Sequence, residues 1–313
     1  METVVTTEPP PPTRILNLPD GRRIGCAEYG DPDGLPVLAL HGTPGSRLMF
    51  ALTDGAARDR GIRIIAPERP GYGLSDYRHV ESLARSAEDL NAVADAYGLD
   101  RFAIIGVSGG APFAMAAAAV NPDRVPLLAL AGPVGPIADL GRNVRISRVH
   151  YLLFRVLAGS GLGPRAFFQA LRYMVFKAPD VAYRWLMRGV KQSDRVVLAR
   201  PDVRASLQAA IREGLRPGVD GAVQDLRLYC APWGLRLADI DVPTIVWQGS
   251  DDTIVPPAAA YALAQALPNC RLDVIQAAGH YWVFAQFDLI LDAVAAALRA
   301  EAAASDQAAT EPE

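Results

Sequence analysis

The sequence predicts an α/β protein with a mostly parallel central sheet, helices on both faces of that sheet, and an inserted all-helical cap. Short apolar runs rich in β-branched residues alternate with helical stretches, which is typical of a parallel sheet. These runs lack the polar–apolar alternation of a sheet with one solvated face. A long stretch in the second half has helical periodicity and no convincing strand.

The composition of the 313-residue chain is that of an ordinary globular protein. Hydrophobic residues make up 50% and charged residues 21%, and the net charge of -3 gives no overall case for nucleic-acid binding. Three cysteines lie far apart, without the spacing of a metal site or a disulfide framework. We see no signal peptide and no run long enough to span a membrane, and therefore expect a cytoplasmic monomer or homodimer without metal or cofactor.

The first part of the chain predicts a β-hairpin followed by repeated strand–helix units. Pro19-Asp20-Gly21 is a turn signal between two strand-like runs. Glycines and prolines punctuate the elements that follow. The expected strands here are 14–18, 22–29, 36–40, 62–66, 102–107 and 126–131, and the expected helices are 48–60, 81–97 and 111–120.

The stretch that follows differs in charge and in periodicity. Residues 139–238 carry a net charge of +10, whereas the remainder carries -13, and their apolar residues form stripes at helical spacing. The strand pattern resumes over 244–248 and 271–275, with helices over 258–267 and 285–299. We therefore expect five regions: a Pro-rich disordered tail (1–13), the first part of the core (14–133), a helical cap or lid (134–238), the second part of the core (239–300) and a disordered tail (301–313).

Ser108 lies between an apolar strand and an alanine-rich helix. Gly106 and Gly110 complete the pattern G-x-S-x-G, in which the missing Cβ atoms let strand and helix approach closely around a tight turn. Such a turn exposes the serine Oγ at a helix N-terminus, where amides and the helix dipole favour negative charge. The pattern predicts a nucleophile, and a Gly-Ser loop without chemistry is the alternative.

Catalytic residue types follow three expected strands in the order Ser108, Asp252 and His280. A serine hydroxyl is a weak nucleophile unless a base takes its proton, and a third group must orient that base. Histidine suits this task because its pKa lies near neutrality. Since the carboxyl ends of parallel strands meet at one edge of a sheet, the three side chains can converge. Asp251 and Asp139 are the alternatives for the acid.

The chain resembles the α/β-hydrolase fold superfamily over roughly residues 24–299, and the order Ser, acid, His is that of the family. One departure is Glu68, where many members have aspartate, and it bears on local packing more than on chemistry. The resemblance rests on five landmarks: His41-Gly42, the glycine-rich turn from Pro70 to Ser75, Gly106-x-Ser108-Gly109-Gly110, Gly249-x-x-Asp252-x-x-Val255-Pro256, and Gly279-His280.

The resemblance also implies an oxyanion hole. One backbone amide is expected from Gly109, directly after the nucleophile, and the other from Thr43. Pro44 cannot serve because it has no N–H. We expect His41 and Gly42 to support this oxyanion loop rather than to transfer protons.

The leading interpretation is a serine hydrolase that cleaves a small or medium carboxylic ester, or an amide or lactone, through an acyl-enzyme. Its partner would be a largely apolar small molecule. The alternatives are a carbon–carbon bond hydrolase, perhydrolase or lyase with the same triad, and a small-ligand receptor on a hydrolase scaffold. An apolar cavity is suggested by side chains of the cap, although packing between cap helices explains most of them: Phe167, Phe168, Tyr173, Met174, Trp185 and Met187.

Overall fold

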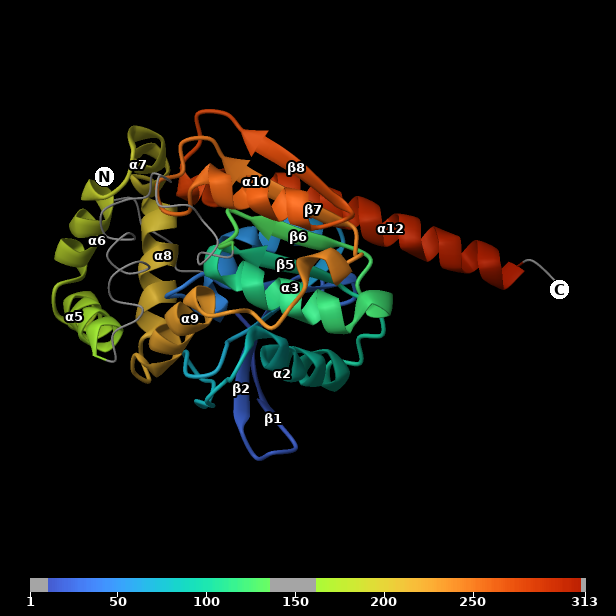
Figure 1. Cartoon of the computed structure of the whole chain (residues 1–313), viewed down its shortest axis with the longest axis horizontal. Coiled ribbons are helices and arrows are strands. Elements are labelled where there is room, and N and C mark those ends of the chain that lie inside the picture. The colour runs from blue at the N-terminus through green and yellow to red at the C-terminus, as the bar shows by residue number, and fades with distance from the viewer. Residues whose placement is uncertain (1–10, 136–161, 311–313) are drawn as a thin grey trace, which may run out of the picture.

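The computed structural model describes residues 11–135 and 162–310, and within them an eight-stranded sheet lies between two layers of helices (Figure 1). The strand order is β1-β2-β4-β3-β5-β6-β7-β8. β2 pairs antiparallel with both β1 and β4, and all other neighbours pair parallel, which confirms the predicted class. The strands are β1 (Thr13–Asn17), β2 (Arg23–Gly30), β3 (Leu35–Leu40), β4 (Ile62–Pro67), β5 (Ala103–Val107), β6 (Leu128–Ala131), β7 (Thr244–Gly249) and β8 (Cys270–Ile275).

Helices cover both faces of this sheet. On one face α2 (Leu83–Ala96), α3 (Ala111–Val120) and α10 (Pro257–Ala266) enclose one apolar cluster. On the other, η1 (Arg47–Thr53), α1 (Asp54–Asp59), α11 (Val283–Gln286) and α12 (Asp288–Thr310) enclose a second. Short 3-10 turns complete this part of the chain: η2 (Ser108–Gly110), η3 (Pro122–Arg124), η5 (Leu237–Asp239) and η6 (His280–Trp282).

The strands have apolar side chains on both faces because both faces are covered. In β3, Leu38 and Leu40 belong to the first cluster, whereas Val37 and Ala39 belong to the second. All four side chains are fully buried. This arrangement explains why the sequence shows continuous apolar runs rather than alternation with polar residues.

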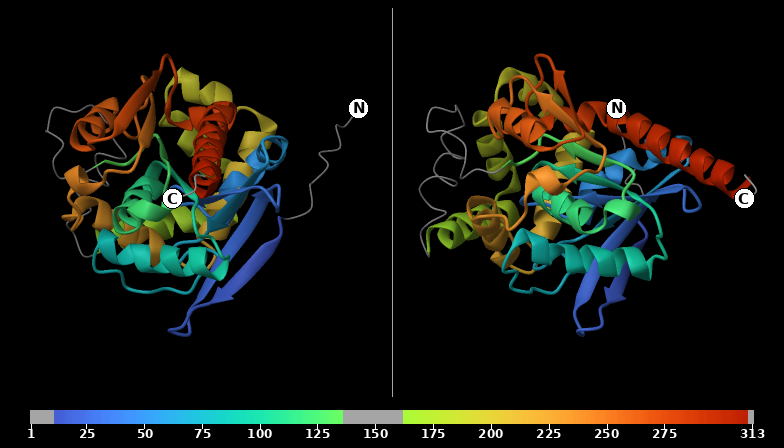
Figure 2. Two further views of the ribbon diagram at one scale, coloured as in Figure 1. Left: turned by 90° about the vertical axis from the view of Figure 1, so that its right-hand side faces the viewer. Right: turned by 45° about the vertical axis from the view of Figure 1, so that its right-hand side comes forward.

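Two elements differ from the sequence-based expectation. The helix expected over 48–60 begins as the 3-10 helix η1 and becomes α-helical only at Asp54. The last helix begins at Asp288 and continues to Thr310, through residues expected to form a disordered tail. Alanine has the highest intrinsic helix propensity, and it dominates this stretch. Figure 2 shows α12 projecting past the edge of the sheet.

Among the described residues, no single helix is both long and apolar enough to cross a membrane. One bent pair, His280–Gln286 with Asp288–Ala304, reaches the required length and composition only when its two parts are taken together.

The chain between β6 and β7 contributes five described helices at one end of the molecule (Figure 1). They are α5 (Gly163–Lys177), α6 (Pro179–Arg188), α7 (Gln192–Leu198), α8 (Pro201–Gly214) and α9 (Asp220–Cys230). α8 packs on η1, which follows β3, and α7 packs on η6, which follows β8. These helices therefore lie at the carboxyl edge of the sheet. That they form a separate cap domain over 134–238 stays a prediction.

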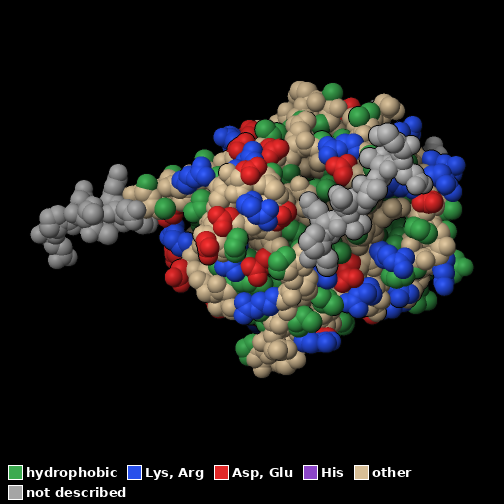
Figure 3. Space-filling model, turned by 180° about the vertical axis from the view of Figure 1, so that it is seen from behind, with side chains coloured by type: hydrophobic (Ala, Val, Ile, Leu, Met, Phe, Trp, Pro, Cys, Tyr) green, Lys and Arg blue, Asp and Glu red, His purple; other side chains and the backbone are tan. Residues whose placement is uncertain are grey.

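The charge asymmetry predicted from the sequence is visible on the surface. On the face in Figure 3, Lys and Arg side chains are frequent at the end opposite the projecting helix α12, where α5–α8 lie. Several arginines of the segment between β6 and β7 form exposed ion pairs with aspartates of the same segment, such as Arg204 with Asp180 and Arg200 with Asp202. Pairs of this kind contribute little to stability.

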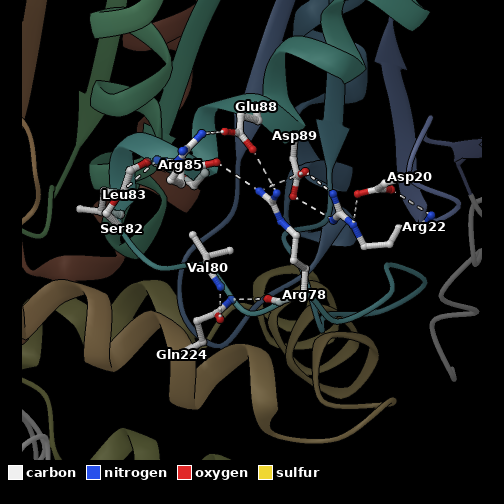
Figure 4. Close-up of polar contacts among 11 residues, drawn as sticks. Asp20, Arg22, Arg78, Val80, Ser82, Leu83, Arg85, Glu88, Asp89 and Gln224 are labelled. Atoms are coloured by element: carbon white, nitrogen blue, oxygen red, sulfur yellow. Dashed lines mark hydrogen bonds and ion pairs between the residues drawn. The ribbon is translucent and has the colours of Figure 1, made fainter.

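Polar contacts fix α9 and the β-hairpin to the rest of the sheet domain (Figure 4). Gln224 of α9 accepts a hydrogen bond from the Val80 amide at 2.8 Å and donates one to the Arg78 carbonyl at 3.0 Å. Arg22, at the end of the hairpin turn, donates two hydrogen bonds to the buried carboxylate of Asp89 in α2, at 3.1 and 2.6 Å. Both contacts join segments far apart in the sequence.

We predict that Gly110→Ala destabilises the protein by about 2 kcal/mol or more, because overpacking against backbone cannot relax easily. A Cβ atom at Gly110 would lie 2.3 Å from the Leu40 carbonyl oxygen. The matched control is Gly55→Ala in α1, where a Cβ atom would meet nothing within 4 Å. That change should stabilise the protein by about 0.5–1 kcal/mol. Denaturant unfolding of both variants measures the difference, and equal stabilities would contradict the close packing of β3 against η2.

Candidate active site

Ser108 lies at a sharp turn between β5 and α3. Its φ of 52° falls in the left-handed region, which is strained for a residue with a side chain. The two flanking glycines explain how the turn is accommodated. A Cβ atom at Gly106 would lie 2.8 Å from Ala111 Cα and Ala114 Cβ, and one at Gly110 would meet the β3 backbone. Both glycines predicted to shape the turn are thus required by close packing.

The structure brings together the three side chains predicted to converge. His280 Nε2 lies 2.9 Å from Ser108 Oγ, and His280 Nδ1 lies 2.7 Å from Asp252 Oδ2. Because the carboxylate accepts at Nδ1, the proton of the neutral ring resides there, and Nε2 can accept the serine proton. This arrangement can convert the serine hydroxyl into a nucleophile.

Asp252 is held in place by four hydrogen bonds. Its Oδ1 accepts from the amides of Ile254 and Val255 at 2.8 and 2.9 Å. Its Oδ2 accepts from His280 and, at 3.1 Å, from the side-chain amide of Gln248. Sequence reasoning missed Gln248, which lies four residues before Asp252 at the end of β7.

The alternatives for the acid are placed differently. Asp251 points to the surface, where its carboxylate pairs with Lys191 at 2.8 Å. Asp139 lies outside the described residues. Gly132, which follows β6, instead packs on the histidine: a Cβ atom there would lie 3.3 Å from the His280 ring.

Burial alone would lower the pKa of His280, but the charge and hydrogen bond of Asp252 together with the charge of Asp194 raise it above its ordinary value. The charged ring is therefore favoured by its carboxylate neighbours despite the lack of solvent. A base of this kind is suited to hold a proton transiently during a reaction.

Gly42, Thr43 and Gly109 lie beside the serine. A Cβ atom at Gly42 would lie 3.5 Å from Ser108 Cβ, and one at Gly109 would lie 2.6 Å from Thr43 Oγ1. The loop after β3 and the turn after β5 are thus in close contact. The two residues predicted to supply oxyanion amides lie next to each other; their role stays a prediction.

A buried network that sequence reasoning missed surrounds this loop. The Arg69 guanidinium donates to the His41 carbonyl, to the Gly42 carbonyl at 3.3 Å and to Thr43 Oγ1 at 2.9 Å. Its charge is paired with Asp225 of α9 at 2.7 Å, and both side chains are almost fully buried. Arg69 therefore connects three consecutive residues of the predicted oxyanion loop to the inserted helices.

Tyr229 lies one turn after Asp225 on α9 and extends the same network. Its hydroxyl donates to the Gly109 carbonyl at 2.7 Å and lies 2.6 Å from Thr43 Oγ1. Thr43 Oγ1 also donates to Asp225 at 2.7 Å. One face of α9 thus contacts both residues of the predicted oxyanion hole. The i,i+4 spacing of Asp225 and Tyr229 is the only sequence signal for this face.

His41 is fully buried and neutral. Burial, then the nearby charge of Arg69, lower its pKa well below its ordinary value. Its Nδ1 donates to the Gly42 carbonyl at 2.8 Å, and its Nε2 accepts from the Arg69 amide at 3.4 Å. These contacts fit the predicted supporting role, because both ring nitrogens are occupied by backbone groups.

Glu68, the departure from the family pattern, is buried beneath the glycine-rich turn. It pairs with Arg47 at 2.8 Å and accepts from the Leu74 amide at 2.7 Å. A Cβ atom at Gly73 would lie 1.9 Å from its carboxylate, so the turn is fitted to this side chain. Burial raises the pKa of Glu68 to about 7, although Arg47 opposes the shift. The negative charge of Glu213, which also pairs with Arg47, adds to the rise.

A cavity of about 420 Å³ opens beside Ser108 and His280. Phe167, Phe168 and Trp185 line it, as the cavity interpretation of the sequence expected, whereas Tyr173 is exposed. Among the described lining residues there is no Asp or Glu, and the only Lys or Arg is the exposed Arg212. Elsewhere in the described part of the chain, no group of three or more His, Cys, Asp or Glu side chains is placed to hold a metal ion.

Comparisons with known proteins identify the family of the chain. A model described as the alpha/beta hydrolase family matches residues 37–293. The chain is 28% identical to a 2-hydroxymuconate semialdehyde hydrolase of Pseudomonas putida, over 83% of this chain and 88% of that protein. It is also 28% identical to a proline iminopeptidase of Neisseria meningitidis, over 85% of this chain and 89% of that protein. The structure of an alpha/beta hydrolase fold protein from Nakamurella multipartita superposes with a TM-score of 0.69 and 25% identity. The superposition covers 93% of this chain and 100% of that one. The resemblance predicted from the sequence is confirmed.

The raised pKa of Glu68, about 7 against an ordinary 4.5, predicts a pH-dependent stability. The folded state binds this proton more tightly than the unfolded state, so the contribution of Glu68 to stability falls as the pH rises from about 5 to about 8. The free energy of unfolding of Glu68→Gln, relative to that of wild type, should therefore rise by on the order of 1–3 kcal/mol between these pH values.

Denaturant unfolding of wild type and Glu68→Gln at several pH values measures this gain. The exposed residue Glu81 supplies the control, because Glu81→Gln should track wild type at every pH. A Glu68→Gln curve parallel to that of wild type would contradict the raised pKa.

Proposed function

This chain belongs to the alpha/beta hydrolase family, and we propose that it is a serine hydrolase that cleaves small or medium, uncharged carboxylic esters. The single observation that carries the proposal is the hydrogen-bonded series Ser108–His280–Asp252 at the wall of an apolar cavity. Such a series needs no cofactor to activate a serine.

In the proposed mechanism, Ser108 Oγ attacks the ester carbonyl carbon while its proton passes to His280 Nε2. Asp252 keeps the proton of the resting ring on Nδ1 and stabilises the imidazolium that forms. The imidazolium then gives a proton to the leaving alcohol, and the acyl group remains on Ser108. A water molecule, activated by His280, releases the acid and restores the serine.

The oxyanion of each tetrahedral intermediate would accept hydrogen bonds from the Thr43 and Gly109 amides. Arg69 and Tyr229 support this assignment because they hold Thr43 by its hydroxyl and Gly109 by its carbonyl. Fixed donors that await the developing charge are worth about 3–4 kcal/mol each in related chemistry.

The cavity lining favours an uncharged substrate. An ionised group buried there without a partner would cost several kcal/mol. Arg212 is exposed, and the charges of the buried Arg47 and Arg69 are already paired. A free amine, which an iminopeptidase substrate presents, would likewise meet no carboxylate among the described lining residues.

Carbon–carbon bond hydrolysis is the second candidate, and the likeness to 2-hydroxymuconate semialdehyde hydrolase favours it. The same triad could serve that reaction. The ester proposal ranks above it because muconate-type substrates carry a carboxylate, for which the described lining offers only Arg212 at the surface. Perhydrolase and lyase chemistry and the ligand-receptor role have no comparable support.

We predict that a fluorophosphonate labels Ser108 and no other residue, and that p-nitrophenyl butyrate is hydrolysed with an initial burst. Ser108→Ala should abolish labelling and lower kcat by about six orders of magnitude, as the loss of a triad nucleophile does elsewhere. Peptide mass spectrometry locates the label, and stopped-flow absorbance measures the burst.

Ser206→Ala is the matched control, because this buried serine of α8 is not among the residues that line the cavity. Its labelling and turnover should equal those of wild type. Labelling at another serine would contradict the mechanism. Tight binding of a small ester without any turnover would favour the receptor instead.

We predict a preference of about 100-fold or more in kcat/KM for p-nitrophenyl pentanoate over p-nitrophenyl 4-carboxybutyrate. The two esters differ at the far end of the acyl chain, where a methyl group is replaced by a carboxylate. The charged end would have to leave water for an apolar wall that includes Phe168 and Leu171. Comparable kcat/KM values for the two esters would show that the cavity accepts anions.

A further inference from the structure

A second buried carboxylate lies next to the histidine loop. Asp194 belongs to α7 and is fully buried. Its Oδ2 accepts a hydrogen bond from the His280 amide at 3.0 Å, and its Oδ1 accepts one from the Tyr281 amide at 2.7 Å. A helix from the segment between β6 and β7 therefore binds the backbone that carries the predicted base.

The close approach of this carboxylate explains the residue before the histidine. A Cβ atom at Gly279 would lie 2.2 Å from both Asp194 Cγ and Oδ2. Any larger residue there would displace the carboxylate from the two amides. The Gly279-His280 pair of the sequence is thus fitted to Asp194.

Among the described residues, Asp194 forms no ion pair with Lys or Arg. Lys191, the residue directly before α7, pairs with Asp251 at the surface instead. The ionisable groups that interact with Asp194 are His280 and Asp252, together with the Tyr281 hydroxyl, which also interacts with Tyr183 of α6. The imidazolium that forms during the proposed reaction would be the only described cation facing these two carboxylates.

We propose that Asp194 is a positioning residue of the reaction, which fixes the His280 backbone and, by its charge, favours the imidazolium. The inference rests on the proposed function. Asp252 orients the ring from one side, and Asp194 acts on the same residue through its main chain. Burial raises the pKa of Asp194 itself, while the two amides and the charge of His280 oppose that rise. Two amide donors stabilise the ionised carboxylate.

The test is Asp194→Asn, assayed on p-nitrophenyl butyrate across pH. Removing a negative charge lowers the pKa of His280, so the acidic limb of kcat/KM should move to lower pH by about half a unit or more. The kcat at pH 7 should fall by about 10-fold, because the imidazolium loses a stabilising charge, and KM should change little.

Asp251→Asn is the matched control. It removes the same charge from the loop after β7, next to Asp252, but from an exposed pair with Lys191 that solvent screens. Its acidic limb and kcat should coincide with those of wild type. If the acidic limb of the kcat/KM profile of Asp194→Asn coincides with that of wild type, the electrostatic role is overturned, whether or not kcat falls.

Two further measurements keep the proposal testable. If wild type labels at no serine and turns over no ester, the proposed function fails. In that case the inference is tested by NMR titration of the His280 ring in wild type and in Asp194→Asn. Equal pKa values of His280 in the two proteins would overturn it. If Asp194→Asn does not fold, the wild-type amides of His280 and Tyr281 are followed by hydrogen exchange and against pH. Both amides should be protected from exchange, and their NMR chemical shifts should change with pH as Asp194 titrates. Rapid exchange or pH-independent chemical shifts would refute the contact.

Discussion

The buried guanidinium of Arg69 imposes the main constraint on this structure. A charge so fully removed from water is tolerated only with a counter-charge and satisfied hydrogen bonds, and Asp225 of α9 supplies the counter-charge. Breaking such a pair by removing one partner costs about 3–5 kcal/mol. Because the same guanidinium bonds to residues 41–43, the conformation of the loop after β3 depends on the docking of a helix that lies far away in the sequence. The sheet positions Ser108, but a contact from outside the sheet completes its surroundings.

The inserted helices therefore participate in the site rather than only covering it. Three of their carboxylates reach the sheet domain: Asp194 at the histidine loop, Glu213 at Arg47, and Asp225 at Arg69. The remaining described carboxylates of this segment pair with arginines at the surface. A rigid movement of the whole segment away from the sheet would leave Arg69 and its partner unpaired and half-solvated. Any motion of this segment costs less if it leaves α7, the end of α8 and α9 in place, because these helices carry Asp194, Glu213 and Asp225.

The sequence was informative where the signal is local. Glycine spacing around Ser108 predicted the turn because close backbone approach leaves few alternatives to glycine. The order of strand ends predicted the convergence of Asp252 and His280, since parallel strands share a carboxyl edge. The expected tail after residue 300 was misjudged, because polar composition was weighed above the helix propensity of alanine.

Long-range contacts escaped sequence reasoning for a physical reason: a buried carboxylate on a helix looks the same in sequence as a solvated one. Charge asymmetry nevertheless held usable information. In a segment of net charge +10, an arginine is expected on any solvated face, whereas a carboxylate is rare and its position is more telling. Asp194 and Asp225 are two of these rare residues, and each is a hydrogen-bond acceptor for the backbone or side chains of the site. In a strongly basic insert, the few carboxylates are thus a better guide than the arginines to where the insert contacts the sheet domain.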